Sequence, residues 1–196
     1  MKLKELFHFL KPPRSWIFFV NGLLAVSAGV VIYLFYVSKA WSYLSDDPET
    51  CINCHIMAPQ YATWQHSIHR LTTTCNDCHV PHDNIFNHYF FKAKDGLRHA
   101  TIFTLRNEPQ VIFIQEAGVE VVQENCKRCH TQLNEKVGTL QVTLENSEHG
   151  EGKLCWDCHR EVPHGRVRSL SSTPSTLVPL PESPIPEWIE DLKAED

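Results

Sequence analysis

The longest apolar stretch of the chain runs from Trp16 to Val37 and contains no charged residue. As an α-helix it would extend roughly 33 Å at about 1.5 Å per residue, which is enough to cross the hydrocarbon core of a bilayer. A cleaved signal peptide is the alternative, but its apolar core is shorter and is followed by small residues. Here the run ends in Phe-Tyr-Val-Ser-Lys. The pattern therefore predicts an uncleaved transmembrane helix over residues 16–37.

Two later segments break the hydrophobic pattern in different ways. Residues 45–49, Ser-Asp-Asp-Pro-Glu, are typical of a helix start, with Ser45 or an aspartate as the cap and the proline in the first turn. A polar linker is the alternative interpretation. Residues 169–196 are rich in serine, threonine and proline. This composition predicts a tail without a packed core of its own, either disordered or lying along a partner.

All 8 cysteines of the chain occur in Cys-x-x-Cys-His motifs. The two thiols of such a motif can form thioethers to one porphyrin, while the adjacent imidazole reaches the iron. Zinc ribbons also use Cys-x-x-Cys pairs, but they do not require a histidine after every second cysteine. The sequence therefore predicts four covalent c-type haems, attached at Cys51 and Cys54, Cys75 and Cys78, Cys126 and Cys129, and Cys155 and Cys158.

Length and charge narrow the class of protein further. Four haems among residues 38–168 leave roughly thirty residues per cofactor, so we expect short helices and little sheet. The predicted fold class is mainly α with extensive irregular structure: one N-terminal transmembrane helix and a small multihaem cytochrome c domain over residues 38–168. The formal net charge of −5 becomes more negative with haem propionates, which disfavours nucleic acid as a partner.

The short segment before the apolar run, residues 1–15, is predominantly basic. Basic flanks favour the cytoplasmic side, so this segment is predicted to be cytoplasmic and the haem domain periplasmic. Bacteria attach c-type haems on that side. The expected location is a bacterial inner membrane, crossed once.

An internal repeat becomes visible when the second and fourth haem motifs are aligned. A Ser-x-His sequence precedes each motif by the same distance, both motifs read Cys-x-Asp-Cys-His, and a Val-Pro-His sequence follows each. The alignment predicts two dihaem repeats. Low-spin haems need a second axial ligand, so the predicted iron ligands are the motif histidines His79, His130 and His159 together with the repeat-related histidines His69, His82, His149 and His164. A surface position is the alternative for each repeat-related histidine.

Met57 lies two residues beyond His55 in the first motif. So short a segment cannot pass round the porphyrin edge to reach the opposite face. Met57 therefore either replaces His55 as the proximal ligand or does not bind iron, in which case core packing is its default role. Spacing alone leaves both alternatives open.

Several features together resemble the NapC/NirT group of membrane-anchored tetrahaem quinol dehydrogenases. These are the anchor helix, Cys-x-x-Cys-His-x-Met, Ser-x-His before the second motif, and the ending Cys-His-Arg-Glu-Val-Pro-His-Gly. Within that group the ending is most similar to the small subunits of cytochrome c nitrite reductases. The resemblance implies that Met57 binds the first haem in place of His55. It also implies that Asp95, in a Lys-x-x-Asp-Gly sequence, lies near the open face of that haem at a quinol site.

The chain departs from the group at one position of the expected quinol site. Group members commonly carry another lysine a few residues before the aspartate, where this chain has Asn87 or His88. His88 and Lys92 are the substitutes that we consider. A carboxylate beside the haem suits the chemistry, because quinol oxidation releases protons and needs an acceptor.

The expected function is oxidation of menaquinol and transfer of electrons to a periplasmic reductase, the pentahaem cytochrome c nitrite reductase. A donor to nitrate reductase, trimethylamine oxide reductase or several reductases is the alternative within the same class. A haem-based sensor and a passive electron relay without a quinol site are alternatives from another class. A sensor would usually carry a cytoplasmic output module, and residues 1–15 are too short for one.

Overall fold

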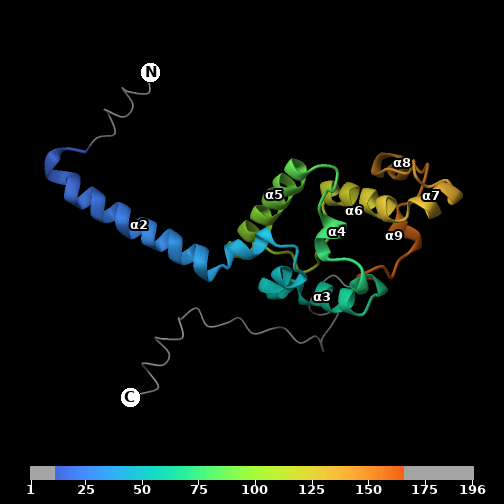
Figure 1. Cartoon of the computed structure of the whole chain (residues 1–196), viewed down its shortest axis with the longest axis horizontal. Coiled ribbons are helices and arrows are strands. Elements are labelled where there is room, and N and C mark those ends of the chain that lie inside the picture. The colour runs from blue at the N-terminus through green and yellow to red at the C-terminus, as the bar shows by residue number, and fades with distance from the viewer. Residues whose placement is uncertain (1–11, 166–196) are drawn as a thin grey trace, which may run out of the picture. The chain divides into compact units, whose positions relative to one another are not determined.

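A computed structural model of the chain describes residues 12–165, and these form helices joined by irregular segments, with no strand in that range (Figure 1). The expectation of a mainly helical fold is therefore confirmed. The chain divides into two compact units between Tyr43 and Leu44, and the predicted domain bounds stay a prediction. The segment 1–11 and residues 166–196, which include the whole predicted tail at residues 169–196, lie outside the described residues.

The first unit is dominated by one long apolar helix. A short 3-10 turn, η1 (Arg14–Trp16), leads into α2 (Ile17–Val37), and the 24 residues Arg14–Val37 are long and apolar enough to cross a membrane. None of the side chains of α2 is buried against the protein. Apolar residues surround the helix on all sides, as expected of a helix whose solvent is lipid. The predicted transmembrane helix, residues 16–37, begins one residue before α2 and ends at the same residue.

Aromatic rings gather where α2 ends. The ring of Trp41 lies 5.6 Å from that of Tyr36 and 6.2 Å from that of Phe35, measured between centroids. Trp41 belongs to η2 (Ala40–Leu44). Aromatic side chains of this kind are typical of the membrane–water interface.

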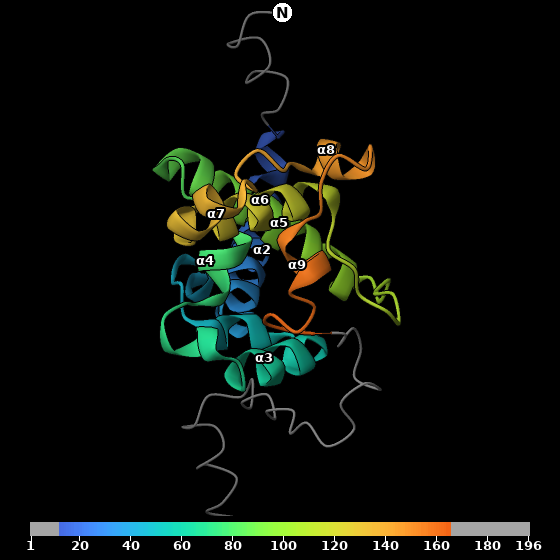
Figure 2. The same cartoon turned by 90° about the vertical axis from the view of Figure 1, so that its right-hand side faces the viewer.

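The second unit contains the haem motifs and consists of short helices, apart from α5 and α6 (Figures 1 and 2). In chain order its elements are η3 (Pro48–Asn53), η4 (His55–Met57), α3 (Ala58–Gln65), η5 (Ile68–Leu71), α4 (Cys75–His79), α5 (Ile85–Thr104), α6 (Glu116–Cys129), α7 (Thr131–Val137), α8 (Leu144–Glu148) and α9 (Cys155–Cys158).

The predicted helix start near residue 47 is confirmed. Asp47 is the N-cap of η3, and its side chain accepts a hydrogen bond from the backbone N–H of Glu49 at 3.0 Å. Pro48 occupies the first turn, where its missing N–H costs no hydrogen bond. The cap therefore fixes the point at which the chain enters the first haem motif.

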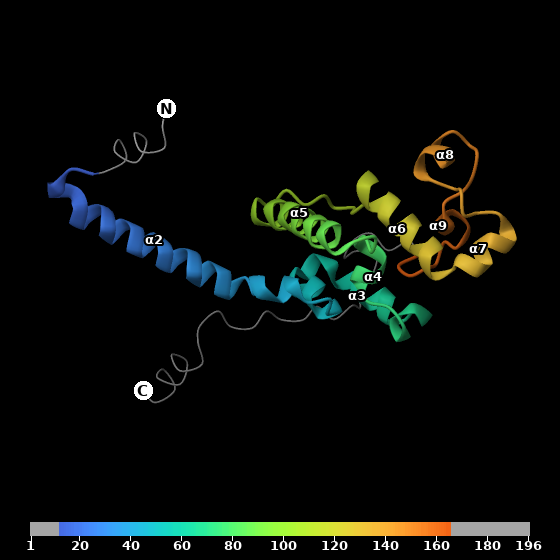
Figure 3. The same ribbon diagram turned by 45° about the horizontal axis from the view of Figure 1, so that its top comes forward.

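Helix α6 is the structural centre of the second unit, and α4 lies against it in all views (Figure 3). Its buried residues are polar: Gln123, Asn125 and Lys127. The Asn125 side-chain amide donates to the carbonyls of Cys78 at 3.0 Å and Val80 at 2.9 Å. The side-chain amide oxygen of Gln123 accepts from the backbone N–H of Cys155 at 3.1 Å. One helix therefore holds the second and fourth motifs by hydrogen bonds from its side chains to their backbones, and it carries the third motif at its own end.

Apolar side chains contribute little to the interior of this unit. Among the described residues, the buried apolar side chains are those of Ala58, Pro59, Val80 and Leu154. So small an apolar core is less than a domain of this length normally buries. Porphyrins held by the four motifs are large apolar groups, and they fit a unit whose own side chains supply so little of its core.

Candidate functional site

Each haem motif is placed on or beside a short helix. The first spans η3 and η4, the second forms α4, the third ends α6 and the fourth forms α9. Residues three apart lie on one side of a helical turn, so the two cysteines of a helical motif face the same way. This is the arrangement that two thioether bonds to one porphyrin require.

The second and fourth motifs share an aspartate with the same structural task. Asp77 accepts hydrogen bonds from the backbone N–H of Thr74 at 2.7 Å and from its hydroxyl at 2.9 Å. Asp157 accepts from the backbone N–H of Leu154 at 2.9 Å. Each carboxylate therefore caps the helix of its own motif. The capping explains why both motifs read Cys-x-Asp-Cys-His, while the duplication itself stays a prediction.

Haem motifs that follow one another in the sequence also lie close together in the structure. The Cys51 and Cys75 thiols of the first and second motifs interact by a hydrogen bond that lowers the pKa of Cys51 and raises that of Cys75. In the third motif, burial and the nearby thiol of Cys155 raise the pKa of Cys126 to about 12. The packing of α4 on α6 brings the second and third motifs together. The four attachment points thus form a continuous series.

Two pairs of imidazoles lie at the separation expected of two ligands on one iron. The ring centroids of His79 and His164 are 6.2 Å apart, and those of His69 and His130 are 6.3 Å apart. An imidazole nitrogen binds a metal at about 2 Å and the ring centre lies about 1 Å behind it, so two axial imidazoles have centres about 6 Å apart. Each pair combines one motif histidine with one repeat-related histidine, and the residues present therefore fit haem iron.

The environment of the first pair favours neutral imidazoles. The pKa of His164 is lowered by burial, and its Nδ1 lies 3.3 Å from the hydroxyl of Thr63, which orients the ring. The pKa of His79 is lowered to about 4, because the surrounding protein weakens hydration of the imidazolium and His164 adds positive charge nearby, while Asp95 opposes the shift. By accessible surface His79 is nevertheless an exposed residue, so only the direction of its pKa shift matters for ligation. A neutral imidazole is the form that binds metal.

The other predicted iron ligands are not placed in such pairs. His82 is exposed; its Nε2 lies 3.2 Å from the carbonyl of Asn76, and its ring is 5.3 Å from that of His88. His149 is exposed, with Nδ1 at 2.8 Å from the carbonyl of Glu145. His159 is exposed in its motif on α9. Ligation by these three residues stays a prediction.

His55 and Met57 of the first motif differ in their surroundings. The His55 ring is exposed and packs edge-on against Phe103 of α5, with centroids 5.7 Å apart. Met57 is half-buried at the end of η4. The aromatic contact is a role for His55 that does not need iron, and ligation by Met57 in place of His55 stays a prediction.

Two of the three predicted quinol-site residues converge on a residue that sequence reasoning had taken only as a helix cap. Lys92 Nζ lies 2.8 Å from Asp46 Oδ1, His88 Nε2 lies 3.9 Å from the same oxygen, and the Asn76 amide donates to it at 2.6 Å. We call these four residues the Asp46 cluster. The hydrogen bond from Lys92, more than that from Asn76, holds the pKa of Asp46 below its usual value. Asp46 and Lys92 are 46 positions apart, so no local pattern could have linked them.

Asp95 lies outside the Asp46 cluster, although it is on the same helix as His88 and Lys92. Its carboxylate is 3.5 Å from Nδ1 of His99 and 3.9 Å from Nη1 of Arg98, and it is about half-exposed. Its electrostatic effect reaches His79 of the second motif. The carboxylate therefore lies near enough to the second haem motif to act on His79, and its ion-pair partners among the described residues are Arg98 and His99.

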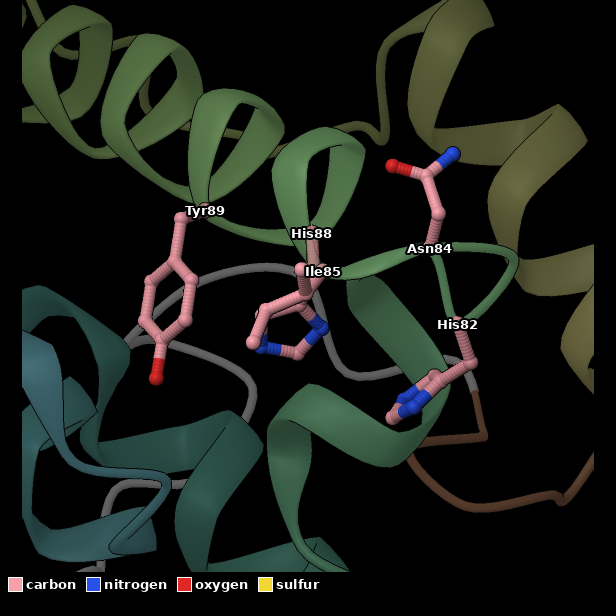
Figure 4. A pocket seen from close by; sticks show the side chains of 5 residues that line it. All are labelled: His82, Asn84, Ile85, His88 and Tyr89. Carbon is pink, nitrogen blue, oxygen red and sulfur yellow. The ribbon is translucent and has the colours of Figure 1, made fainter.

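A small pocket of about 280 Å³ opens at the start of α5. His88 and Tyr89 point to the same side of the helix as His82, whereas Asn84 points away (Figure 4). Ile85 completes the lining, so the pocket combines apolar and imidazole surface.

The motifs, the imidazole pairs and the apolar helix define a membrane-anchored multihaem c-type cytochrome. Residues 13–169 match the model of the NapC/NirT cytochrome c family, N-terminal region, and the chain belongs to that family. The earlier resemblance is therefore confirmed, and with it the expectation of c-type haems; the attachment of each haem at particular cysteines stays a prediction.

Two relatives and one solved structure refine the comparison. The chain is 46% identical over 160 residues to the cytochrome c-type protein NrfH of Wolinella succinogenes, covering 79% of this chain and 89% of the relative. It is 36% identical over 142 residues to the cytochrome c nitrite reductase subunit NrfH of Nitratidesulfovibrio vulgaris, covering 72% and 82%. A crystal structure of a cytochrome c nitrite reductase NrfHA complex bound to the inhibitor HQNO shares the fold, with a TM-score of 0.52, 32% identity and coverage of 79% and 95%.

Proposed function

We propose that the protein is the quinol-oxidising subunit of a membrane-bound cytochrome c nitrite reductase and that menaquinol is its electron donor. The observation that carries the proposal is the series of four haem motifs on a chain that is also 46% identical to an NrfH protein. A related NrfHA complex binds HQNO, a quinol-like inhibitor, which supports a quinol site. The catalytic partner is then the pentahaem nitrite reductase, where nitrite reduction takes place.

The residues that hold the cofactors follow from the motifs and the imidazole pairs. The eight cysteines attach four haems; His79 and His164 ligate the second, and His69 and His130 the third. Met57 ligates the first in place of His55. When bound, the haems supply one-electron redox chemistry between the quinol and the partner. His82, His149 and His159 remain the proposed ligands for the rest.

Around the first motif the protein's own groups handle the protons. We place the quinol on the face of α5 that carries His88, Lys92 and Asp95. Asp95 accepts a proton as the quinol is oxidised, because a carboxylate is the base available on that face. Lys92, held by Asp46, keeps positive charge beside the site. His88 takes the place of the lysine that other family members commonly carry.

The proposed orientation places the N-terminus in the cytoplasm and residues 38–168 in the periplasm of the bacterial inner membrane. The basic composition of residues 1–15 supports it. Purification of the complex from membranes tests the whole proposal: the chain should co-purify with a pentahaem nitrite reductase, and the complex should reduce nitrite with a menaquinol analogue. Co-purification with a molybdenum-containing nitrate reductase instead would contradict it.

Four haems on an uncleaved anchor give a simple mass prediction. The intact mass of the purified chain should exceed that of the polypeptide, with Met1 or Lys2 still present, by four haem groups. The physical reason is that thioether bonds survive denaturation, whereas iron–histidine bonds do not. A mass with three haems, or a chain that begins after residue 30, would contradict the prediction.

Asp46→Asn should slow haem reduction by a menaquinol analogue roughly fivefold. The change keeps the shape of the side chain but removes the charge that holds Lys92, and a partly exposed ion pair is worth up to about 1 kcal/mol. Stopped-flow absorbance of the haems measures the rate. Asp47→Asn is the matched control, because asparagine caps η3 as well as aspartate does. Equal rates in the two variants would exclude a specific role for Asp46.

A further inference from the structure

Helix α5 exposes an apolar stripe on its outer side. Phe86, Phe90 and Leu97 are spaced by four and seven residues, so they lie on one stripe of the helix. Their exposed fractions are 85%, 69% and 71%. In a soluble protein such a stripe would face the core. On α5, where no residue is buried, it does not.

The polar face of α5 makes the contacts with the rest of the second unit. His88 follows Phe86 by two positions, and Lys92 follows Phe90 by two positions. Two positions correspond to about 200° round the helix. Lys92 binds Asp46, and His88 Nδ1 lies 2.9 Å from the carbonyl of Pro81. The first haem motif also approaches from this side, through the contact of His55 with Phe103. The outer stripe is therefore not needed to cover that motif.

Chain connectivity limits how far α5 can lie from the point where the chain leaves the bilayer. Lys92 donates to the carbonyl of Ser45 and to the carboxylate of Asp46. Asp46 follows Val37, the last residue of α2, by nine positions, a distance that an extended chain spans in at most about 30 Å. The segment that holds α5 is thus the segment that leaves the bilayer. Lys94 and Arg98 are exposed and lie along one edge of the stripe, and their side chains are long enough to reach lipid phosphates.

We infer that the outer stripe of α5, formed by Phe86, Phe90 and Leu97, lies in the headgroup region of the bilayer that α2 spans. The arrangement is that of an interfacial helix with an apolar face and a basic edge. It goes beyond the proposed quinol oxidation and agrees with it. The inner face of α5 is then held at the depth where a quinol leaves the lipid.

Site-specific photocrosslinking tests this inference on the full-length haem-loaded complex in native membranes. Benzoylphenylalanine replaces Phe90 in one variant and Leu71 in a control, because Leu71 of η5 is equally exposed, at 74%, but lies outside α5. Haem content verifies folding of both. After illumination, mass spectrometry of the chain should show a phospholipid adduct with several-fold higher yield at position 90 than at position 71.

The other outcomes overturn the inference. A polypeptide adduct at position 90, to the catalytic subunit or to a second copy of this chain, would make the stripe a protein interface. Equal lipid adducts at both positions would show that α5 is not specifically placed. No adduct at position 90 would show that the stripe faces water. The readout does not involve quinol, so its failure is distinguishable from failure of the proposed function.

Discussion

Asp95→Asn should slow haem reduction by a menaquinol analogue by about 10²-fold or more, the range typical of a lost general base. Asparagine preserves the volume of the side chain, but it removes the charge that faces Arg98 and His99 and cannot accept the proton that the quinol releases. Stopped-flow reduction of the purified complex in vesicles measures the rate. Reduction by dithionite, which needs no proton acceptor, should remain complete for all four haems.

His88→Ala tests whether the quinol site includes the pocket at the start of α5 as well as Asp95. His88 lines the pocket at the start of α5, whereas Asp95 does not. If the quinol occupies the pocket beside His88 and also contacts Asp95, His88→Ala raises the KM for the analogue, whereas Asp95→Asn mainly lowers kcat. A normal rate in Asp95→Asn would leave Asp95 as a solvated residue paired with Arg98. The proton acceptor would then have to be sought in the Asp46 cluster.

Local patterns were sufficient where neighbouring residues determine the structure. The uncharged run at residues 16–37 and the Asp47-Pro48 helix start were both found in the expected places. The haem motifs are also local, because two cysteines and a histidine in five residues define the attachment chemistry. Family membership then followed from residues that lie close together in the sequence.

Contacts between distant segments could not be predicted in the same way. Asp46 was read as a possible helix cap, and its ion pair with Lys92 depends on how η3 and α5 are placed against each other. Likewise, spacing gave a list of candidate histidines but no pairing with individual haems. The sequence pattern also did not predict that α5 exposes its apolar face and packs with its polar face. A helical pattern shows that two faces differ, but it does not show which face is turned inward.

The imidazole pairs give a prediction whose expected effect is as large as that of Asp95→Asn. His164→Ala should convert one haem from low spin to high spin, and His69→Ala should convert a different one. The reason is that loss of a strong axial ligand weakens the field at a single iron. Electron paramagnetic resonance of the oxidised complex counts the low-spin centres. The double variant should therefore lose two of them, since His164 lies opposite His79 and His69 opposite His130.

His66→Ala is the matched control, because His66 is an exposed histidine near His69 whose Nδ1 lies 2.7 Å from the carbonyl of Ala62. Its spectrum should be unchanged. Thr63→Val provides a finer test: it removes the hydroxyl beside His164 Nδ1 but leaves the ligand in place, so the haem should stay low-spin while its reduction potential shifts. Unchanged low-spin signals in both His164→Ala and His69→Ala would show that the two ring separations reflect packing between neighbouring helices, and the axial ligands would then have to come from His82, His149 or the catalytic partner.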